Sequence, residues 1–233
     1  MLSQINKRLK TAERSLATRF GTDISTPAAR RAAMAHFHLI DHGILRTIWT
    51  NQYQIAPGVW RSNQPSPARM NRLHRLGIKT ILNLRGADRF SFYLFEKEAC
   101  DRLGIELIDL KIYARNLVPR DRFLQLFEIF DRIDKPFLMH CKSGADRAGL
   151  ASALWLLDQE GTGLPRAKSM LSLKYVHLKN TRTGLMDHLL EVYEQDCATA
   201  PMPIREWFAR RYDPATITAS FHRKMGWPPP PQT

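Results

Sequence analysis

The sequence contains few cysteines, and their positions exclude two common roles for this residue. Three occur among 233 residues, Cys100, Cys141 and Cys197, and they lie far apart. An odd and scattered set does not form a complete disulfide framework. No cysteine–histidine cluster has the spacing of zinc ligands. We therefore expect a reducing compartment and no metal, and nothing in the sequence indicates a cofactor.

Long apolar stretches are also missing. Crossing a bilayer takes roughly 20 apolar residues, and the best run here, residues 148–157, has about half that length. Charged residues, Arg147 and Asp158, bound it on both sides. The N-terminus lacks the apolar core of a secretory signal. We expect a cytoplasmic protein.

Acidic residues are outnumbered by basic ones. The chain has 35 Lys and Arg against 22 Asp and Glu, a formal net charge of +13. A chain this basic usually has an anionic partner, which can be nucleic acid, an acidic membrane surface or a phosphorylated ligand. No nucleic-acid recognition motif is present, so we do not expect a nucleic-acid partner. The apolar fraction of 44% is sufficient for a folded core.

The N-terminal residues have the pattern of an amphipathic helix. Residues 2–20 place apolar side chains on one stripe and basic side chains on the other faces. Three interpretations remain open: a helix packed on the domain, a helix lying on an anionic membrane surface, and an organellar targeting peptide. Glu13 speaks against the third. We divide the chain into a basic helical extension (1–50), a central domain (51–200) and a C-terminal helix with a Pro-rich tail (201–233).

Strand and helix patterns alternate through the central domain. Strands are predicted over residues 54–61, 78–84, 105–112 and 136–140. Helices are predicted over residues 28–48, 66–76, 90–103, 119–133, 147–159, 165–175, 182–196 and 203–211. Pro57-Gly58 interrupts the first strand pattern, which predicts a hairpin or a bent edge strand. The alternation predicts an α/β fold with a mostly parallel central sheet of about four to five strands flanked by helices.

Residues 137–149, FLMHCKSGADRAG, place a cysteine at the end of a predicted strand and an arginine at the start of a helix. Ligands of such sheets bind at the carboxyl ends of the strands. The first N–H groups of a helix and its dipole attract anions there. Gly144 allows a tight curl, and Arg147 can grip two phosphate oxygens. The same field favours the thiolate of Cys141, which can attack phosphorus to give a phosphocysteine that water then hydrolyses.

The residues His140-Cys141, Gly144 and Arg147 reproduce the signature HC-x-x-G-x-x-R. The chain therefore resembles the cysteine-dependent protein tyrosine and dual-specificity phosphatases, over roughly residues 53–196. Upstream, VWRSNQP (59–65) is similar to an edge strand of that family, and IKTILNLR (78–85) is similar to the strand that follows. The resemblance implies the phosphatase-like α/β fold for the central domain.

The resemblance also implies roles for the loop. Cys141 would be the nucleophile, Arg147 the phosphate clamp, and His140 would orient the loop and help keep the thiolate ionised. The loop from the residue after the nucleophile to the arginine would line the phosphate pocket with its backbone amides: Lys142, Ser143, Gly144, Ala145, Asp146 and Arg147.

Two departures from the family pattern affect the expected chemistry. Many relatives carry Ser or Thr after the arginine, and its hydroxyl eases loss of the thiolate; here Ala148 stands there, so we expect slow hydrolysis of the phosphocysteine, with Ser143 as the only nearby substitute. Most relatives also carry a general-acid aspartate on an upstream loop. The corresponding residues here, 113–120, include no carboxylate.

The candidate for the acid is Asp146, in a G-x-D-R arrangement like that of myotubularin-like lipid phosphatases and certain bacterial phosphatases. An ion pair that orders the loop is its alternative role, and Asp121 and Asp109 are the alternative acids. Basic residues predicted around the mouth of the site favour a substrate with more than one negative charge: Lys111, Arg115, Arg120 and Lys142.

The leading hypothesis is a phosphatase acting on phosphotyrosine or on dual phosphoresidues of proteins. A phospholipid or inositol-phosphate phosphatase with the same chemistry is the alternative, favoured by the G-x-D-R loop, the basic N-terminal helix and the net charge. The third possibility is a phosphate-binding pseudophosphatase, which Ala148 and the missing acid loop would explain. Contact with an anionic membrane through the N-terminal helix is left open.

Overall fold

The computed structural model describes residues 20–230. The helix expected over residues 2–20 lies almost wholly outside the described residues, as does the end of the Pro-rich tail. Contacts between residues divide the chain into two compact units. The first unit comprises the described residues up to Thr50, together with Pro65–Leu76 and Ala87–Ile105. The second unit comprises Asn51–Gln64, Gly77–Gly86 and the chain from Glu106 onward.

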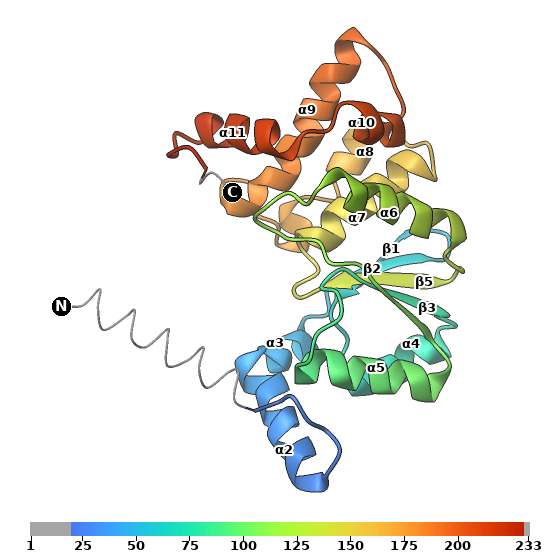
Figure 1. Ribbon diagram of the computed structural model, residues 1–233. Coiled ribbons are helices and arrows are strands. Elements are labelled where there is room, and N and C mark those ends of the chain that lie inside the picture. The colour runs from blue at the N-terminus through green and yellow to red at the C-terminus, as the bar shows by residue number, and fades with distance from the viewer. Residues whose placement is uncertain (1–19, 231–233) are drawn as a thin grey trace, which may run out of the picture. The chain divides into compact units, whose positions relative to one another are not determined.

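The second unit holds a five-stranded sheet with the strand order β1-β2-β5-β3-β4 (Figure 1). Strand β1 pairs antiparallel with β2 through a turn at Gly58, whose φ is +73°, and all other pairs are parallel. The predicted hairpin and the predicted mostly parallel sheet flanked by helices are therefore confirmed. The strands are β1 (Tyr53–Ala56), β2 (Val59–Asn63), β3 (Thr80–Asn83), β4 (Glu106–Asp109) and β5 (Phe137–Cys141).

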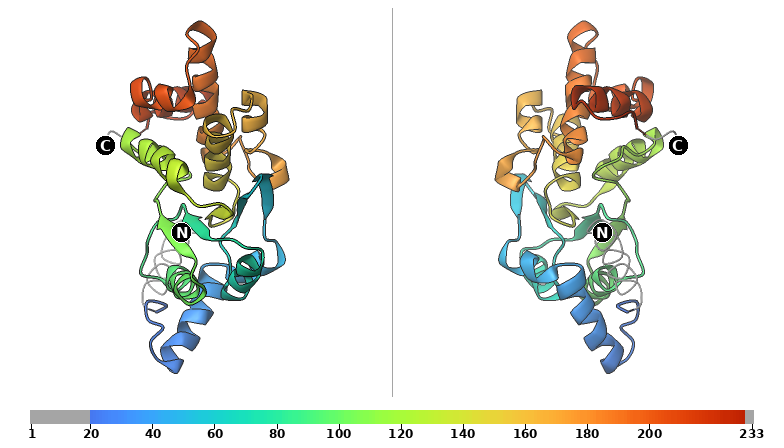
Figure 2. Two further views of the ribbon diagram at one scale, coloured as in Figure 1. Left: turned by 90° about the vertical axis from the view of Figure 1, so that its right-hand side faces the viewer. Right: turned by 90° about the vertical axis from the view of Figure 1, so that its left-hand side faces the viewer.

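The helices of the second unit lie together on one side of the sheet (Figures 1 and 2). Helix α7 is apolar on nearly every face, which is the pattern of a buried helix, and its Trp155 packs edge-on against Phe130 and Phe137. The longer helices are α6 (Arg120–Arg132), α7 (Arg147–Asp158), α8 (Leu164–Lys168), α9 (Leu185–Thr199), α10 (Ile204–Arg210) and α11 (Pro214–Lys224). Two short 3-10 helices are η2 (Leu173–Tyr175) and η3 (Arg182–Gly184).

The first unit is helical. Helix α4 starts as predicted, with the Ser66 hydroxyl accepting a hydrogen bond from the Arg69 N–H (3.3 Å), and α5 stops at Gly104, whose φ is +66°. Its small apolar core includes Phe37 and Phe95, whose rings meet edge-on. The elements are α2 (Pro27–Ala35), the π-helix η1 (His36–Ile40), α3 (Gly43–Ile48), α4 (Pro67–Arg75) and α5 (Ser91–Leu103).

Some of the predicted helices differ from the structure, and one helix was not predicted. The single helical pattern over 28–48 is broken at His42, whose φ is +59°. The pattern over 165–175 divides into α8 and η2. Helix α11 was not predicted at all, although Asp213 caps it by accepting a hydrogen bond from the Thr216 N–H (2.6 Å) and Pro214 follows the cap. Within residues 20–230, no helix combines the length and apolar character needed to cross a membrane.

Candidate active site

Cys141 is the last residue of β5 and Arg147 is the first residue of α7. The loop between them therefore runs from the carboxyl end of a central strand to a helix N-terminus, as predicted. Gly144 turns the loop with φ +75°, and a Cβ atom there would lie 2.6 Å from backbone atoms of Ser62 and Asn63. The loop thus passes so close to the end of β2 that only glycine fits.

The sulfur of Cys141 lies inside this loop. The Gly144 N–H donates a hydrogen bond to Sγ (3.3 Å), and the cysteine is only 1% exposed. The His140 side chain is buried beside it, with Nδ1 3.3 Å from the Cys141 carbonyl oxygen. The sulfur of Cys141 therefore faces a backbone N–H of its own loop.

Arg61 of β2 binds the loop between Cys141 and Arg147 through the backbone carbonyl oxygens of the loop. Its fully buried guanidinium donates to the carbonyl oxygens of Gly144 (2.6 Å), Ala145 (3.2 Å) and Met170 (2.7 Å), and it lies 3.8 Å from the centre of the Tyr175 ring. Burial lowers the pKa of Arg61 to about 10, so the side chain keeps its charge at neutral pH. These hydrogen bonds tie the Gly144 and Ala145 carbonyls to β2 and so fix the conformation of the loop.

Asn51 supports the loop from a second direction. Its side-chain amide donates to the carbonyl oxygens of Ser143 (3.1 Å) and Tyr175 (3.0 Å), and the residue is buried with φ +47°. Asparagine is among the few residues other than glycine that tolerate the left-handed backbone region. Sequence reasoning missed the roles of both Asn51 and Arg61. The signal for Arg61 was a cationic residue directly after the apolar pair Val59 and Trp60 in a predicted strand.

Arg147 reaches across the carboxyl end of the sheet. Its Nη1 makes long hydrogen bonds to the carbonyl oxygens of Leu84 (3.5 Å) and Ile112 (3.4 Å). Its Nε is buried and has no hydrogen-bond partner within residues 20–230. A buried donor is costly to leave unpaired, and a bound phosphate oxygen would satisfy it. Arg147, the predicted phosphate clamp, therefore has a buried N–H donor that is unsatisfied within the described residues.

Asp146 belongs to a chain of three side chains. Its Oδ1 pairs with Nδ1 of His177 (2.7 Å), and Nε2 of His177 pairs with Oδ2 of Asp187 at the start of α9 (2.5 Å). Burial alone lowers the pKa of His177, but the hydrogen bonds and charges of Asp146 and Asp187 outweigh it and raise the pKa to about 9. At neutral pH an imidazolium thus lies between two carboxylates. Neither His177 nor Asp187 was predicted as a site residue.

The other two candidate acids occupy different positions. Asp109 ends β4 and accepts a hydrogen bond from the Asn83 side chain (2.8 Å). Asp121 is exposed in the first turn of α6, where a carboxylate complements the helix dipole. Ala148 is fully buried in the first turn of α7 and supplies no hydroxyl. Within the described residues, no cluster of His, Cys, Asp and Glu could hold a metal ion.

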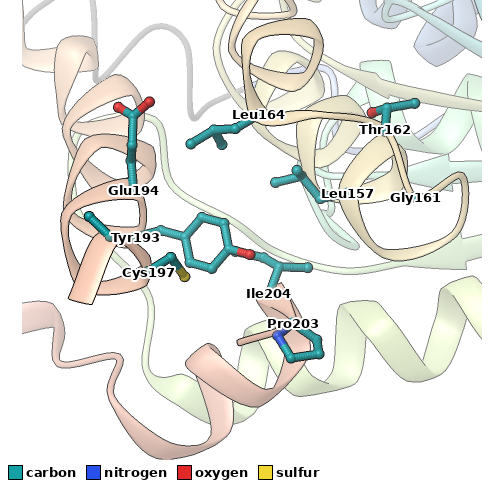
Figure 3. Close-up of a pocket in the computed structure, with 10 residues that line it drawn as sticks. Leu157, Gly161, Thr162, Leu164, Tyr193, Glu194, Cys197, Pro203 and Ile204 are labelled. Carbon is teal, nitrogen blue, oxygen red and sulfur yellow. The ribbon is translucent and has the colours of Figure 1, made fainter. Parts of the chain in front are cut away.

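A hollow of about 470 Å³ lies elsewhere in the second unit, between the end of α7, α8, α9 and the start of α10 (Figure 3). Leu157, Tyr193, Cys197 and Ile204 line it, and no residue of the catalytic loop does. The Cys197 sulfur lies 3.6 Å from the Met202 carbonyl oxygen. This hollow is separate from the loop that carries Cys141.

The sheet and the loop that joins β5 to α7, with Cys141 and Arg147 at its two ends, have the arrangement of the cysteine-dependent tyrosine and dual-specificity phosphatases. Residues 30–184 match the sequence profile of a family described as "DSP-PTPase phosphatase fused to NAD+ Kinase". That match spans well over half of the chain, and the chain belongs to this family. No curated protein matches the sequence.

Solved structures with similar folds include three phosphatases. TpbA of P. aeruginosa has a TM-score of 0.51 at 22% identity, covering 61% of this chain and 84% of its own. The core catalytic domain of the PP-IP phosphatase SIW14 from S. cerevisiae has a TM-score of 0.47 at 18% identity, covering 77% and 94%. A putative phosphatase (DUF442) from Shewanella putrefaciens CN-32 has 0.49 at 15%, covering 64% and 97%. The TpbA match supports the fold assignment.

Proposed function

We propose that this phosphatase hydrolyses phosphate monoesters through a phosphocysteine on Cys141, with phosphotyrosine or dual phosphoresidues of proteins as its leading substrates. One observation carries the chemistry: the Gly144 N–H points at Sγ of Cys141, while Nε of Arg147 is a buried donor without a partner in the described chain. A nucleophilic sulfur and an unsatisfied cationic donor at the two ends of one short loop suit a phosphate group.

The reaction has two steps. The Cys141 thiolate attacks phosphorus, the S–P bond forms, and the P–O bond to the leaving group breaks with its electron pair on oxygen. Water then attacks the phosphocysteine, the S–P bond breaks, and the thiolate and inorganic phosphate are released. Arg147 and the loop amides stabilise the charge on the phosphoryl oxygens in both steps.

Asp146 is our candidate for the proton transfers. Its Oδ1 is held by His177, and its Oδ2 makes no hydrogen bond within residues 20–230. Asp146 is thus held in the loop that carries Cys141, where we propose that it accepts a proton from the attacking water. A phenolate leaves with little help, whereas an alkoxide needs a proton, so this arrangement favours aryl phosphates such as phosphotyrosine.

Phospholipid or inositol-phosphate headgroups are the second candidate substrates. The net charge of +13 favours them, because a basic surface concentrates multiply charged ligands. We further propose a cytoplasmic location, which the three free cysteines support. Attachment to anionic membranes through the N-terminal residues stays a proposal that rests on their composition.

The test is phosphate release from a phosphotyrosyl peptide, a phosphoseryl peptide and a phosphoinositide. Wild type is compared with Cys141→Ser and Asp146→Asn. We expect the serine variant to be inactive on all three and the asparagine variant to lose most activity on the alkyl phosphates. Turnover by Cys141→Ser would refute the phosphocysteine, and full activity of Asp146→Asn on every substrate would refute the role of Asp146.

A further inference from the structure

A second hollow, of about 260 Å³, is lined by residues of the loop after β4, of η3 and the start of α9, and of α11 and the chain after it. One wall comes from the loop after β4 and contains Arg115. The opposite wall comes from η3 and the start of α9 and contains Arg182, while α11 and the residues after it close the hollow. Its remaining lining residues are Asn116, Leu185, Thr218, Phe221, His222, Trp227 and Pro230.

Both walls of this hollow are tied to the catalytic loop. On one side, Ile112 accepts the hydrogen bond of Arg147 (3.4 Å), and Arg115 follows three residues later. Three residues of chain span at most about 10 Å. On the other side, Asp187 follows Arg182 by five residues and binds His177, which in turn binds Asp146. The hollow and the phosphate loop therefore share their supporting elements.

The chemistry of the hollow suits an anion. Arg115 and Arg182 are exposed, and neither makes a hydrogen bond or an ion pair within residues 20–230. Among the described residues, no acidic side chain lines the hollow. Each guanidinium offers a planar fork that matches two oxygens of a phosphate. Phe221 is buried and Trp227 half-buried, so the hollow also offers an apolar surface to the part of a substrate that joins two charged groups.

We propose that this hollow binds a second phosphate group of the substrate, whose first phosphate is the one attacked by Cys141. The inference rests on the proposed function and narrows it to molecules carrying two phosphate monoesters. The backbone of Arg115 lies within about 10 Å of that of Ile112, whose carbonyl oxygen accepts a hydrogen bond from Arg147, so one small substrate can engage both sites. A doubly phosphorylated peptide and an inositol bisphosphate share this chemistry, and the experiment separates them.

The experiment measures kcat and KM for four probes at low and high salt. The probes are p-nitrophenyl phosphate, a phosphotyrosyl peptide, the same peptide with a phosphoserine two residues away, and an inositol bisphosphate. Arg115→Gln and Arg182→Gln remove one guanidinium each. Arg223→Gln is the matched control, because Arg223 is exposed on α11 and does not line the hollow.

We expect wild type to prefer a doubly phosphorylated probe, through a lower KM and more strongly at low salt. Each hollow variant should reduce the preference for the doubly over the singly phosphorylated peptide about tenfold, the size of one charge-assisted hydrogen bond, while the Arg223 control keeps it. If the preference appears with the inositol bisphosphate alone, the substrate is the headgroup, and the hollow variants must then lose that preference.

Two results would overturn the inference. One is hydrolysis of p-nitrophenyl phosphate by wild type without preference for either doubly phosphorylated probe. The other is an equal loss in the Arg223 control and the hollow variants. Neither result touches the proposed function, which fails only if wild type releases no phosphate from any probe or if Cys141→Ser still does.

Discussion

Replacing His177 with glutamine keeps a hydrogen-bonding side chain between Asp146 and Asp187 but removes its positive charge. In the native chain the two carboxylates raise the pKa of this buried imidazole from 6.5 to about 9. A pKa raised on folding means that the folded state binds the proton more tightly than the unfolded state. The corresponding stabilisation is about 3 kcal/mol, since each pKa unit is worth about 1.4 kcal/mol.

The pH dependence of this stabilisation has a defined direction. It is fully present below the ordinary histidine pKa of 6.5, declines as the pH rises, and is lost once the pH passes the folded value of about 9. The difference in the free energy of unfolding between wild type and His177→Gln should therefore be larger at pH 6 than at pH 10, by about 3 kcal/mol. Urea unfolding followed by tryptophan fluorescence at pH 6, 7.5 and 10 measures it.

Asp187→Asn provides the matched comparison, because it leaves the imidazole in place and removes one of its two carboxylates. Its destabilisation should follow the same pH trend with a smaller amplitude. A destabilisation by His177→Gln that is equal at pH 6 and pH 10 would refute the charged Asp146–His177–Asp187 chain. It would show that glutamine costs stability through its shape alone.

Two further predictions concern the loop itself. Gly144→Ala should abolish phosphate release and lower the free energy of unfolding by about 2–4 kcal/mol. The new Cβ would collide with the backbone of Ser62 and Asn63, and the φ of +75° is unfavourable for alanine. Activity above a tenth of wild type, or an unchanged melting temperature, would contradict this prediction. Ala148→Ser should speed hydrolysis of the phosphocysteine and so raise steady-state kcat while leaving the initial burst of p-nitrophenol unchanged. Rapid-mixing kinetics would separate the two phases, and a kcat no higher than wild type would show that loss of the thiolate is not limiting.

The parts of the site that lie together in the sequence were predictable. An apolar strand, a cysteine, a glycine and an arginine at the start of a helix follow one another from β5 to α7, and each has a local physical signature. The sheet was predictable for the same reason, because every strand carries its own apolar pattern. The predicted helix boundaries were wrong where the backbone turns at a residue other than glycine or proline, as at His42. Helix α11 was missed because the capping residue Asp213 was overlooked.

The supporting residues were not predictable, because their partners lie far away in the chain. Asn51 and Ser143 are 92 positions apart, Arg61 and Gly144 are 83 apart, and His177 and Asp146 are 31 apart. No local pattern marks an asparagine or a histidine as the partner of a distant loop. Their roles follow only from the folding of the strands and helices that carry them.

The nucleophile ends a strand and the clamp begins a helix, so the spacing between sulfur and guanidinium is set by how α7 rests on β5. That contact is made by large aromatic rings, with Trp155 against Phe137 at a centroid distance of 4.9 Å. Close-packed interiors transmit small displacements instead of absorbing them. The aromatic core beneath α7 thus sets the distance between the Cys141 sulfur and the Arg147 guanidinium. A cavity made in this core would change that distance and lower activity even in a chain that still folds.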